Sequence, residues 1–345
     1  MHERAPRRIL VTGGAGFIGS ALCRRLIAEG YTVCNADKLT YASNLANLAS
    51  VETHPAYSFV ELDIVDNRPL LSVFRSFQPD AVLHLAAESH VDRSISNAPI
   101  FVQTNVVGTT VMLDAALTYW NENGRTPTFR FVHVSTDEVY GDLPLEGGRF
   151  TEDTPYNPSS PYSASKAASD FMAAAWCRTY GLPVVISNCS NNYGPYQNIE
   201  KLIPLMIDKA VRGEQLPVYG KGLNVRDWLH VDDHVEGLER VMLFGQIGSR
   251  YNFGGDSERA NIDVVHTICK HLDEKRTKPK GSYADQIAYV TDRLGHDLRY
   301  AVDSSRAREE LGWRPLRQFE EGLGETVDWY LANQEWCEAS RRKLG

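Results

Sequence analysis

The sequence predicts an α/β protein built on a doubly wound parallel sheet, with a smaller α/β lobe towards the C-terminus. Short apolar runs rich in β-branched residues alternate with longer helical patterns over the first half of the chain. The apolar runs are nearly continuous, as expected for strands that are covered on both faces. With 43% hydrophobic and 23% charged residues among 345, the chain can also bury a sizeable core.

The alternation can be assigned element by element. We expect strands at 9–12, 32–37, 57–62, 81–85, 129–135 and 183–188. Helices fall between them at 17–29, 69–77, 99–119 and 163–180. Strands that alternate with helices pair in parallel through right-handed crossovers, so the pattern predicts one sheet with helices on both faces.

The pattern changes after about residue 188, where turn-rich segments interrupt shorter helices. We therefore expect a first domain over 1–188, to which the chain returns at about 225–250. Residues 189–345 form most of the second, smaller lobe. No low-complexity stretch or flexible linker separates the two parts, so we expect them to pack closely.

Composition excludes several classes of protein. The net charge of -8 argues against nucleic acid as a partner, because phosphate binding needs a strong basic patch. No apolar run approaches the roughly 18 residues of a membrane span. The six cysteines are scattered without a C-x-x-C pair, and no secretory signal precedes the first strand. We expect a cytoplasmic protein that binds neither membrane nor nucleic acid and has no disulfide framework.

The first strand leads directly into a glycine-rich turn. Gly13, Gly16 and Gly19 allow a tight turn, a close approach of backbone N–H groups to a pyrophosphate, and close packing of helix on strand. The phosphate would lie at the positive end of the helix dipole. The second strand ends in Asp37, whose carboxylate would bind ribose hydroxyls and repel a 2′-phosphate. The sequence therefore predicts a Rossmann-type site for NAD rather than NADP.

Further polar residues fall where ligands bind in such sheets, at the carboxyl ends of strands. Thr136, Asp137 and Glu138 follow the strand at 129–135. Tyr162 and Lys166 share one face of the next helix, since they are four residues apart. We expect the lysine ammonium, helped by a positive nicotinamide, to lower the pKa of the phenol, so that Tyr162 can act as a base on a sugar or alcohol hydroxyl. Thr136 is placed to hydrogen-bond the same oxygen.

Several blocks together resemble the extended short-chain dehydrogenases/reductases and, more narrowly, the dTDP-glucose 4,6-dehydratase family. They are TGGAGFIGS (12–20), DKLTY (37–41), LAAESHVDRSI (85–95), STDEVYG (135–141), PYSASK (161–166), SNCSNNYGPY (187–196), RDWLH (226–230) and GHD (295–297). The resemblance runs from about residue 8 to 315. The TDE and LAAESHVDR blocks are the specific ones, and the other blocks are shared with sugar-nucleotide epimerases and decarboxylases.

The resemblance implies a mechanism in which NAD is reduced and regenerated in each turnover. Tyr162 takes the C4 hydroxyl proton while a hydride passes from C4 to NAD+. The 4-ketone acidifies the C5 proton, which Glu138 removes while Asp137 protonates the departing C6 hydroxyl. The hydride then returns to C6. An acid in this role needs a raised pKa, which burial beside another carboxylate would provide.

The resemblance also implies binding residues. For NAD they are Gly13, Gly16, Phe17, Ile18, Gly19, Asp37, Lys38, Leu39, Thr40, Asp63, Ile64, Leu85, Ala86, Ala87, Ser89, Thr104, Tyr162, Lys166 and Asn192. For the nucleotide sugar they are Ser89, Thr136, Asp137, Glu138, Asn191, Lys201, Leu202, Pro217, Val218, Tyr219, Arg226, Asn261, Asp292, Arg293 and His296. The Arg226 guanidinium suits a diphosphate. Residues 197–199 and Leu294 depart from the family pattern near the nucleotide, which leaves the choice between dTDP and UDP open.

Other readings remain as alternatives. One is a UDP-sugar 4,6-dehydratase, and another is a sugar-nucleotide 4-epimerase or decarboxylase on the same fold. The 4-epimerase has no use for a pair such as Asp137 and Glu138. A catalytically silent NAD-binding sensor would need none of the catalytic residues. His230 and His234 have helical spacing, but Val231 stands where a zinc protease needs glutamate, so we expect no metal.

We also expect a homodimer. The helices at 99–119 and 163–180 carry apolar residues on more than one face, namely Val106, Val107, Val111, Phe171, Met172 and Trp176. One face can cover the sheet and leave the other for a partner. In the resembled family the two helices form an intersubunit four-helix bundle, which implies an isologous dimer here.

Overall fold

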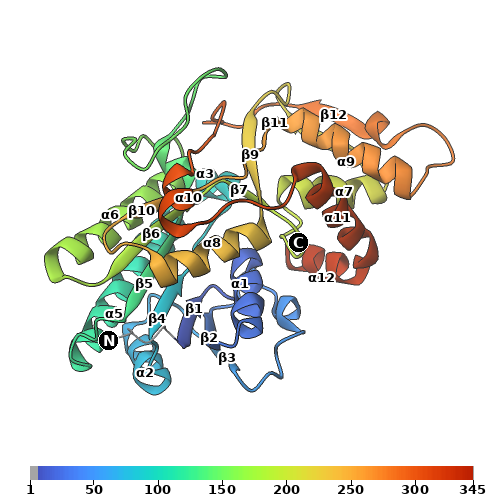
Figure 1. Cartoon of the computed structure of the whole chain (residues 1–345). Helices are drawn as coiled ribbons and strands as arrows, with labels where there is room; N and C mark the ends of the chain where they lie inside the picture. The colour runs from blue at the N-terminus through green and yellow to red at the C-terminus, as the bar shows by residue number, and fades with distance from the viewer. Residues whose placement is uncertain (1–6, 345) are drawn as a thin grey trace.

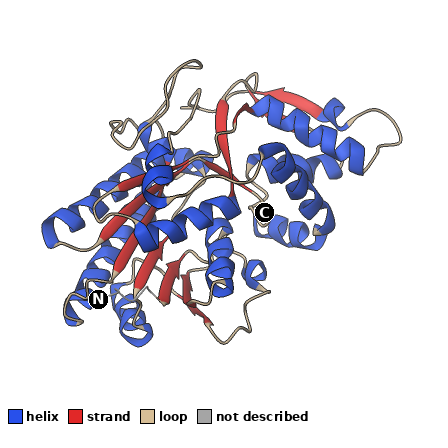
Figure 2. Cartoon of the chain, in the orientation of Figure 1, coloured by secondary structure: helices blue, strands red, loops and turns tan. Residues whose placement is uncertain are grey.

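A seven-stranded parallel sheet lies at the centre of the computed structural model, which describes residues 7–344 (Figures 1 and 2). Its strand order is β10-β6-β5-β4-β1-β2-β3, and every neighbouring pair is parallel. The strands are β1 (Arg8–Thr12), β2 (Thr32–Asp37), β3 (Tyr57–Glu61), β4 (Ala81–His84), β5 (Arg130–Thr136), β6 (Val184–Cys189) and β10 (Arg250–Phe253). The chain order reverses between β1 and β4, which is where such sheets bind ligands.

Helices cover both faces of the sheet, as the alternation predicts. One layer contains α1 (Phe17–Ala28), α8 (Val231–Phe244) and α10 (Ser305–Leu311), and the other contains α2 (Asn67–Phe77), α5 (Thr109–Glu122) and α6 (Pro161–Tyr180). Side chains of a strand alternate between the layers: Ile9 and Val11 pack into the first core and Leu10 into the second. Two packed cores therefore hold the strand ends, and the loops beyond them, in place.

The helix before β5 is longer than expected and is not uniform. A short helix α4 (Ala98–Phe101) continues into a π-helical segment η2 (Val102–Gly108) and then into α5. Within residues 7–344, the continuous helix Ala98–Glu122 alone is long and apolar enough to span a membrane, and half of its most apolar window is buried inside the protein. It packs against α2 and α6, as a core helix does.

The second lobe is built mainly from the later part of the chain, at the upper right of Figure 1. β7 (Asn191–Tyr193), β9 (Val225–His230) and β11 (Glu258–Ala260) form a three-stranded sheet, and β8 (Leu216–Tyr219) pairs with β12 (Ile287–Val290). Around them lie α7 (Leu202–Val211), α9 (Asn261–Lys275), α11 (Phe319–Ala332) and α12 (Gln334–Leu344). The remaining short elements are η1 (Leu45–Leu48), α3 (Val91–Ser96), η3 (Asp137–Tyr140) and η4 (Tyr283–Gln286).

The six expected strands of the large sheet are confirmed with ends shifted by at most one residue. The seventh strand, β10, was not predicted. It has four residues and forms the sheet edge beside β6, so its place is decided by pairing across the molecule rather than by its local sequence.

Candidate active site

A cavity opens at the carboxyl ends of β1, β2, β4, β5 and β6, on the side of the sheet that meets the second lobe. Most of the residues expected to bind NAD line it, namely Gly13, Gly16, Phe17, Ile18, Gly19, Asp37, Lys38, Thr40, Ile64, Leu85, Ala86, Ala87, Ser89, Thr104, Tyr162, Lys166 and Asn192. Leu39 and Asp63 are outside the lining but touch it, because Leu39 N donates to Asp37 and Asp63 pairs with Lys38. The catalytic residues Thr136, Asp137 and Glu138 line the same cavity.

The glycine turn leaves room for a phosphate against backbone. Gly13 has φ +72°, and a Cβ there would lie 2.7 Å from the Ala86 nitrogen. A Cβ on Gly19 would lie 2.1 Å from the Gly13 carbonyl oxygen. The helix α1 begins after Gly16, and no side chain caps its first turn. Its free N–H groups therefore point towards the cavity, and the turn fits a dinucleotide pyrophosphate.

Asp37 is fixed by three donors at the end of β2. Its Oδ2 accepts from Ala15 N at 3.0 Å, and its Oδ1 accepts from Leu39 N and Ser43 Oγ, both at 2.8 Å. The neighbouring Lys38 ammonium lies 3.4 Å from the Asp63 carboxylate, so it is already paired. A fixed carboxylate beside a neutralised lysine favours a ribose 2′-hydroxyl over a 2′-phosphate.

Two acidic residues begin the short helix η3 directly after β5. Thr136 caps this helix, because its Oγ1 accepts from Glu138 N at 3.3 Å, and the same hydroxyl donates to Asp137 Oδ1 at 3.3 Å. Asp137 is 1% exposed, and its Oδ2 has no hydrogen-bond partner among the described residues. Burial, followed by the charges of Glu138 and Asp227, raises the pKa of Asp137 well above its usual range. The site therefore favours the protonated form of Asp137, as an acid needs.

Glu138 has a different electrostatic environment. Burial raises the pKa of this carboxyl as well, but three cations, Arg293, Arg226 and Lys201, act to lower it. At Asp137, the groups that act to lower the pKa are one cation, Arg226, and the Thr136 hydroxyl. The two adjacent carboxyls are thus separated into a more acidic and a less acidic group, which suits one base and one acid.

Tyr162 and Lys166 lie in the first turns of α6, which starts with Pro161 after a Ser160 capping box. Lys166 is buried, and its Nζ donates to the Val134 carbonyl oxygen at 2.8 Å. Burial, together with the charges of Glu138 and Cys189, raises the pKa of Tyr162 well above 10, against the effect of the Thr136 hydroxyl. The expected lowering of this pKa depends on the positive nicotinamide as well as on Lys166, so it stays a prediction for the protein with its cofactor.

The residues expected to bind the sugar nucleotide divide into two groups. Ser89, Thr136, Asp137, Glu138, Asn191 and Lys201 line the cavity. Leu202, Pro217, Val218, Tyr219, Arg226, Asn261, Asp292, Arg293 and His296 belong to the adjoining lobe and are not part of the lining. Arg226 donates to the Asp297 and Val225 carbonyl oxygens and stacks 4.3 Å above the Tyr300 ring. Arg226 forms no salt bridge among the described residues. Its charge acts to lower the pKa of both Asp137 and Glu138.

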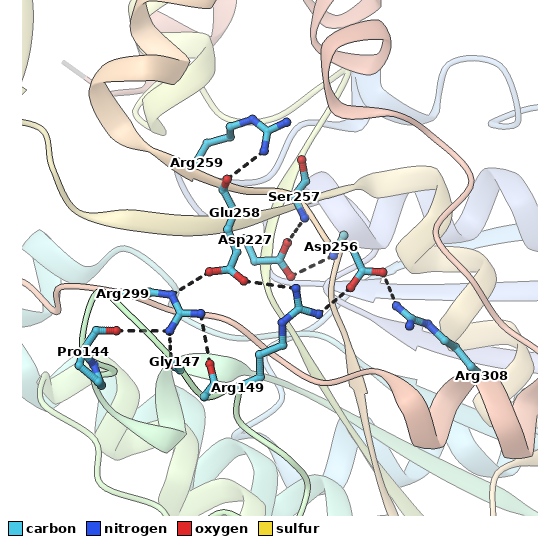
Figure 3. A network of polar contacts seen from close by, with 12 residues as sticks. Pro144, Gly147, Arg149, Asp227, Asp256, Ser257, Glu258, Arg259, Arg299 and Arg308 are labelled. Atoms are coloured by element: carbon cyan, nitrogen blue, oxygen red, sulfur yellow. Dashed lines mark hydrogen bonds and ion pairs between the residues drawn. The ribbon is translucent and has the colours of Figure 1, made fainter.

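A polar network next to the acid pair ties a surface loop to the second lobe (Figure 3). Arg299 donates to Glu258 at 2.7 Å and to the Gly147 carbonyl oxygen at 2.7 Å. Asp227 accepts from the backbone of Gly255 at 3.0 Å and Ser257 at 2.7 Å. Burial raises the pKa of Asp227 to about 6. The network therefore stabilises the loop around Gly147 and places a second buried acid near Asp137.

Several cavity residues were not predicted from the sequence. Cys189, Ser190 and Glu200 are examples, whereas Glu88 of the expected 85–89 stretch and Gln197 and Asn198 of the 197–199 departure line the cavity as well. Glu200 receives a hydrogen bond from Arg93 at 3.1 Å, and Cys189 ends β6. The available signal was position, since residues 189–190 directly follow a predicted strand and Glu200 precedes Lys201.

The two histidines with helical spacing have separate environments. His230 packs edge-on against the Tyr193 ring, whereas His234 Nδ1 lies 2.9 Å from Asn192 Oδ1. Across residues 7–344, no group of three or more histidine, cysteine, aspartate or glutamate side chains has the arrangement of a metal site. His84 is a packed core residue, as expected, with Thr12 and Thr109 hydroxyls 2.7 and 3.0 Å from its ring nitrogens.

Comparison with known proteins gives consistent matches. The family model described as GDP-mannose 4,6 dehydratase matches residues 10–326. The dTDP-glucose 4,6-dehydratase of Neisseria meningitidis serogroup B is 56% identical over 336 residues, covering 96% of this chain and 95% of that protein. The enzyme of the same name from Salmonella typhimurium is 54% identical over 340 residues, covering 95% and 94%. The structure of DesIV, a dTDP-glucose 4,6-dehydratase from Streptomyces venezuelae with NAD bound, has a TM-score of 0.88 at 46% identity and covers 96% and 99%.

Proposed function

The chain belongs to the dTDP-glucose 4,6-dehydratase family and catalyses the NAD-dependent dehydration of dTDP-glucose, and we propose how its residues divide that reaction. The observation that supports the division best is the pair of adjacent carboxyls beside Tyr162, with Asp137 buried and Glu138 partly buried. An oxidation alone needs no such pair, whereas the removal of water needs a base and an acid.

The first domain, residues 1–188 with later returns, would hold the cofactor. Gly13, Gly16 and Gly19 leave space for its pyrophosphate, and Asp37 would accept the ribose hydroxyls. Bound there in oxidised form, NAD would supply a hydride acceptor for C4, a positive charge near Tyr162 and, once reduced, the hydride that is returned to C6. The remaining proton transfers fall to side chains of this chain.

Tyr162 is the base for the C4 hydroxyl. Its phenol is neutral in the protein alone, because burial holds its pKa high. It becomes basic only when positive charge gathers around it, and Lys166 on the same face of α6 provides part of that charge. Thr136 lies beside the phenol and would hydrogen-bond the same substrate oxygen. This arrangement couples the start of the reaction to occupancy of the site.

Glu138 and Asp137 carry out the elimination. Once C4 is a ketone, Glu138 takes the proton from C5, and Asp137 gives its proton to the C6 hydroxyl, which leaves as water. A hydride then adds at C6 and a proton returns to C5, which gives the 4-keto-6-deoxy sugar. Asp137 suits the acid because its pKa lies well above the usual range, and Glu138 suits the base because three cations stabilise its anion.

The second lobe, mainly residues 189–345, would bind the nucleotide diphosphate. Lys201, Arg226 and Arg293 bring three cations towards Glu138, and two phosphates carry the complementary charge. Gln197, which departs from the family pattern, joins neighbouring segments. Its side-chain Nε2 donates to the Asn192 main-chain carbonyl oxygen, and its main-chain carbonyl oxygen accepts from the Tyr330 hydroxyl. Leu294 is 77% exposed, so it stands free at the surface of this lobe.

We also propose a cytoplasmic homodimer. All six cysteines are free thiols, which suits a reducing compartment. Phe171 on α6 is 57% exposed, while Val102 and Val107 of η2 are 51% and 40% exposed. Val111, Met172 and Trp176 instead pack partly against the sheet core. The apolar surface left on this face would be covered by the same face of a second copy.

One assay tests the function as a whole. The purified protein is incubated with dTDP-glucose, and separately with UDP-glucose, without added cofactor. The alkali-induced absorbance of a 4-keto-6-deoxy sugar should form faster from dTDP-glucose. Interconversion of glucose and galactose at C4, without water loss, would instead indicate an epimerase.

A further inference from the structure

A buried carboxylate that the proposed mechanism does not use lies on the catalytic helix α6, one turn beyond Lys166. Asp170 is 0% exposed and follows Lys166 by one turn of α6. Its Oδ1 accepts from His133 Nε2 at 3.1 Å, and its Oδ2 accepts from Tyr156 OH at 2.7 Å and Asn188 Nδ2 at 3.2 Å. A carboxylate without water is strongly destabilising unless it is paired and hydrogen-bonded, so three donors from three segments indicate a site built to hold an anion.

The Asp170 network reaches the catalytic residues along two routes. The first is electrostatic and runs along α6 to Lys166, whose ammonium has the Val134 carbonyl oxygen as its hydrogen-bond acceptor. The second is a chain of hydrogen bonds, because Asn188 Nδ2 also donates to the Thr136 carbonyl oxygen at 3.1 Å. Thr136 directly precedes the acid pair. Asp170 is thus linked to Tyr162 through Lys166, and to the segment that carries the acid pair through Asn188.

The groups that face Lys166 leave Asp170 as the charge that balances it. Burial, aided by the charge of Lys166, lowers the pKa of His84 on β4 and of His133 on β5. Burial raises the pKa of Cys189 on β6 to about 12. These three groups are therefore neutral near neutral pH, as is the Tyr162 phenol.

The pKa of the Asp170 carboxyl, in contrast, is shifted in the direction that favours its charged form. Burial acts to raise the pKa of Asp170, but the His133 imidazole that hydrogen-bonds it, the charge of Lys166 and the Tyr156 hydroxyl together lower it. Burial lowers the pKa of Lys166, and Asp170 is the strongest influence that raises it. The buried ammonium and the buried carboxylate support each other's charge.

We propose that Asp170 is a positioning residue for C4 oxidation: its carboxylate is the buried counter-charge that keeps Lys166 an ammonium and, through Asn188, fixes the main chain at Thr136. The inference rests on the proposed roles of Tyr162 and Lys166. Without the carboxylate, Lys166 would lose its proton at a lower pH, and Tyr162 would face a neutral amine instead of a cation.

The test measures NADH formation in a single turnover with dTDP-glucose as a function of pH. In Asp170→Asn, the alkaline limb of this profile should move to lower pH by about one unit or more, which is a loss of about tenfold or more at a fixed pH on that limb. Asp170→Glu should restore the limb, because it returns the carboxylate. The matched control is Ser169→Ala, which removes the other partner of His133 Nε2, at 3.1 Å, without changing any charge. Its limb should stay in place.

Two results would overturn the proposal. A folded Asp170→Asn variant with the wild-type alkaline limb would show that the residue is structural only. If Asp170→Asn does not fold, the proposed charge balance requires that adding Lys166→Met restores folding, since the unbalanced ammonium is then gone. A double variant no more stable than Asp170→Asn would refute the charge balance. Tyr162→Phe and Lys166→Met variants that oxidise substrate at wild-type rates would refute the roles of that pair instead, independently of Asp170.

Discussion

Replacing Asp137 by asparagine separates the oxidation of C4 from the loss of water at C6. The side chain is 1% exposed and keeps nearly the same volume after the change. Because the pKa of Asp137 is raised well above its usual range, the site favours the neutral carboxyl in the wild-type protein. The substitution therefore removes a transferable proton without altering the local charge, and we expect the fold and the bound NAD to persist.

The size of the effect follows from that role. Removal of a positioned acid slows its step by about 10²–10⁴-fold, which corresponds to roughly 3–5 kcal/mol in the barrier for dehydration. C4 oxidation needs Tyr162 but not Asp137, so NADH absorbance should rise on mixing with dTDP-glucose and then persist. Quenched samples should contain a 4-keto hexose that still carries its C6 hydroxyl.

Matched variants make the result decisive. Glu138→Gln should also spare oxidation, but it should lose exchange of the C5 proton with solvent deuterium. Tyr162→Phe should abolish the NADH signal. Well-folded Asp137→Asn and Glu138→Gln proteins that dehydrate at wild-type rates would refute the assignment of the acid and the base. Equal loss of both steps, with altered circular dichroism or lost NAD, would identify misfolding.

The same substitution predicts a change in stability with a defined sign. An aspartate whose pKa is raised on folding binds its proton more tightly in the folded state. The wild-type free energy of unfolding should therefore fall as pH rises from the unfolded pKa of Asp137 to its folded pKa. Asp137→Asn has no such proton, so its stability should fall less over that range, as measured by thermal unfolding at several pH values. A steeper fall in the variant would contradict the raised pKa.

Three further predictions concern the cofactor and assembly. The protein should be active without added NAD, and its denatured supernatant should contain NAD(H) but no NADP(H); consumption of one cofactor per product would contradict this. Gly19→Ala should lose bound NAD and activity, since its Cβ would lie 2.1 Å from the rigid Gly13 carbonyl oxygen; full retention of NAD would show that the turn does not hold it. Phe171→Glu should convert a dimer to a monomer in light scattering, because it places a charge at a 57% exposed apolar position on α6; an unchanged dimer would place the interface elsewhere.

Much of the fold was predictable because the strands of the large sheet are buried on both faces and therefore stand out as apolar runs. The run at 32–37 is an example, since β2 has these bounds. The β10 strand (Arg250–Phe253) could not be found in this way, because four residues at a sheet edge carry no period. The π-helical turn at Val102–Gly108 was equally hidden. Its hydrogen-bond pattern differs from an α-helix, but its composition does not.

The predictability of the site also depends on whether a feature is determined by nearby or by distant residues. Gly13, Gly19 and Asp37 could be predicted because their roles depend on backbone geometry at a strand end. The burial of Tyr162 and Lys166 could not, since their spacing shows that they share a helix face but not that both are buried. Burial depends on the strands and loops that cover them, and these come from distant parts of the chain.

Burial of the catalytic groups has opposite consequences for the two steps of the reaction. For Asp137 the loss of water is useful, because it keeps the acid protonated until a leaving hydroxyl needs the proton. For Tyr162 and Lys166 the same loss of water is unfavourable, because both act in their charged forms. One cavity can serve both steps only if a nearby anion stabilises the Lys166 ammonium without also acting on the Asp137 carboxyl. Asp170 meets this condition, since it is not part of the cavity lining and acts on Lys166 but is not among the charges that dominate at Asp137.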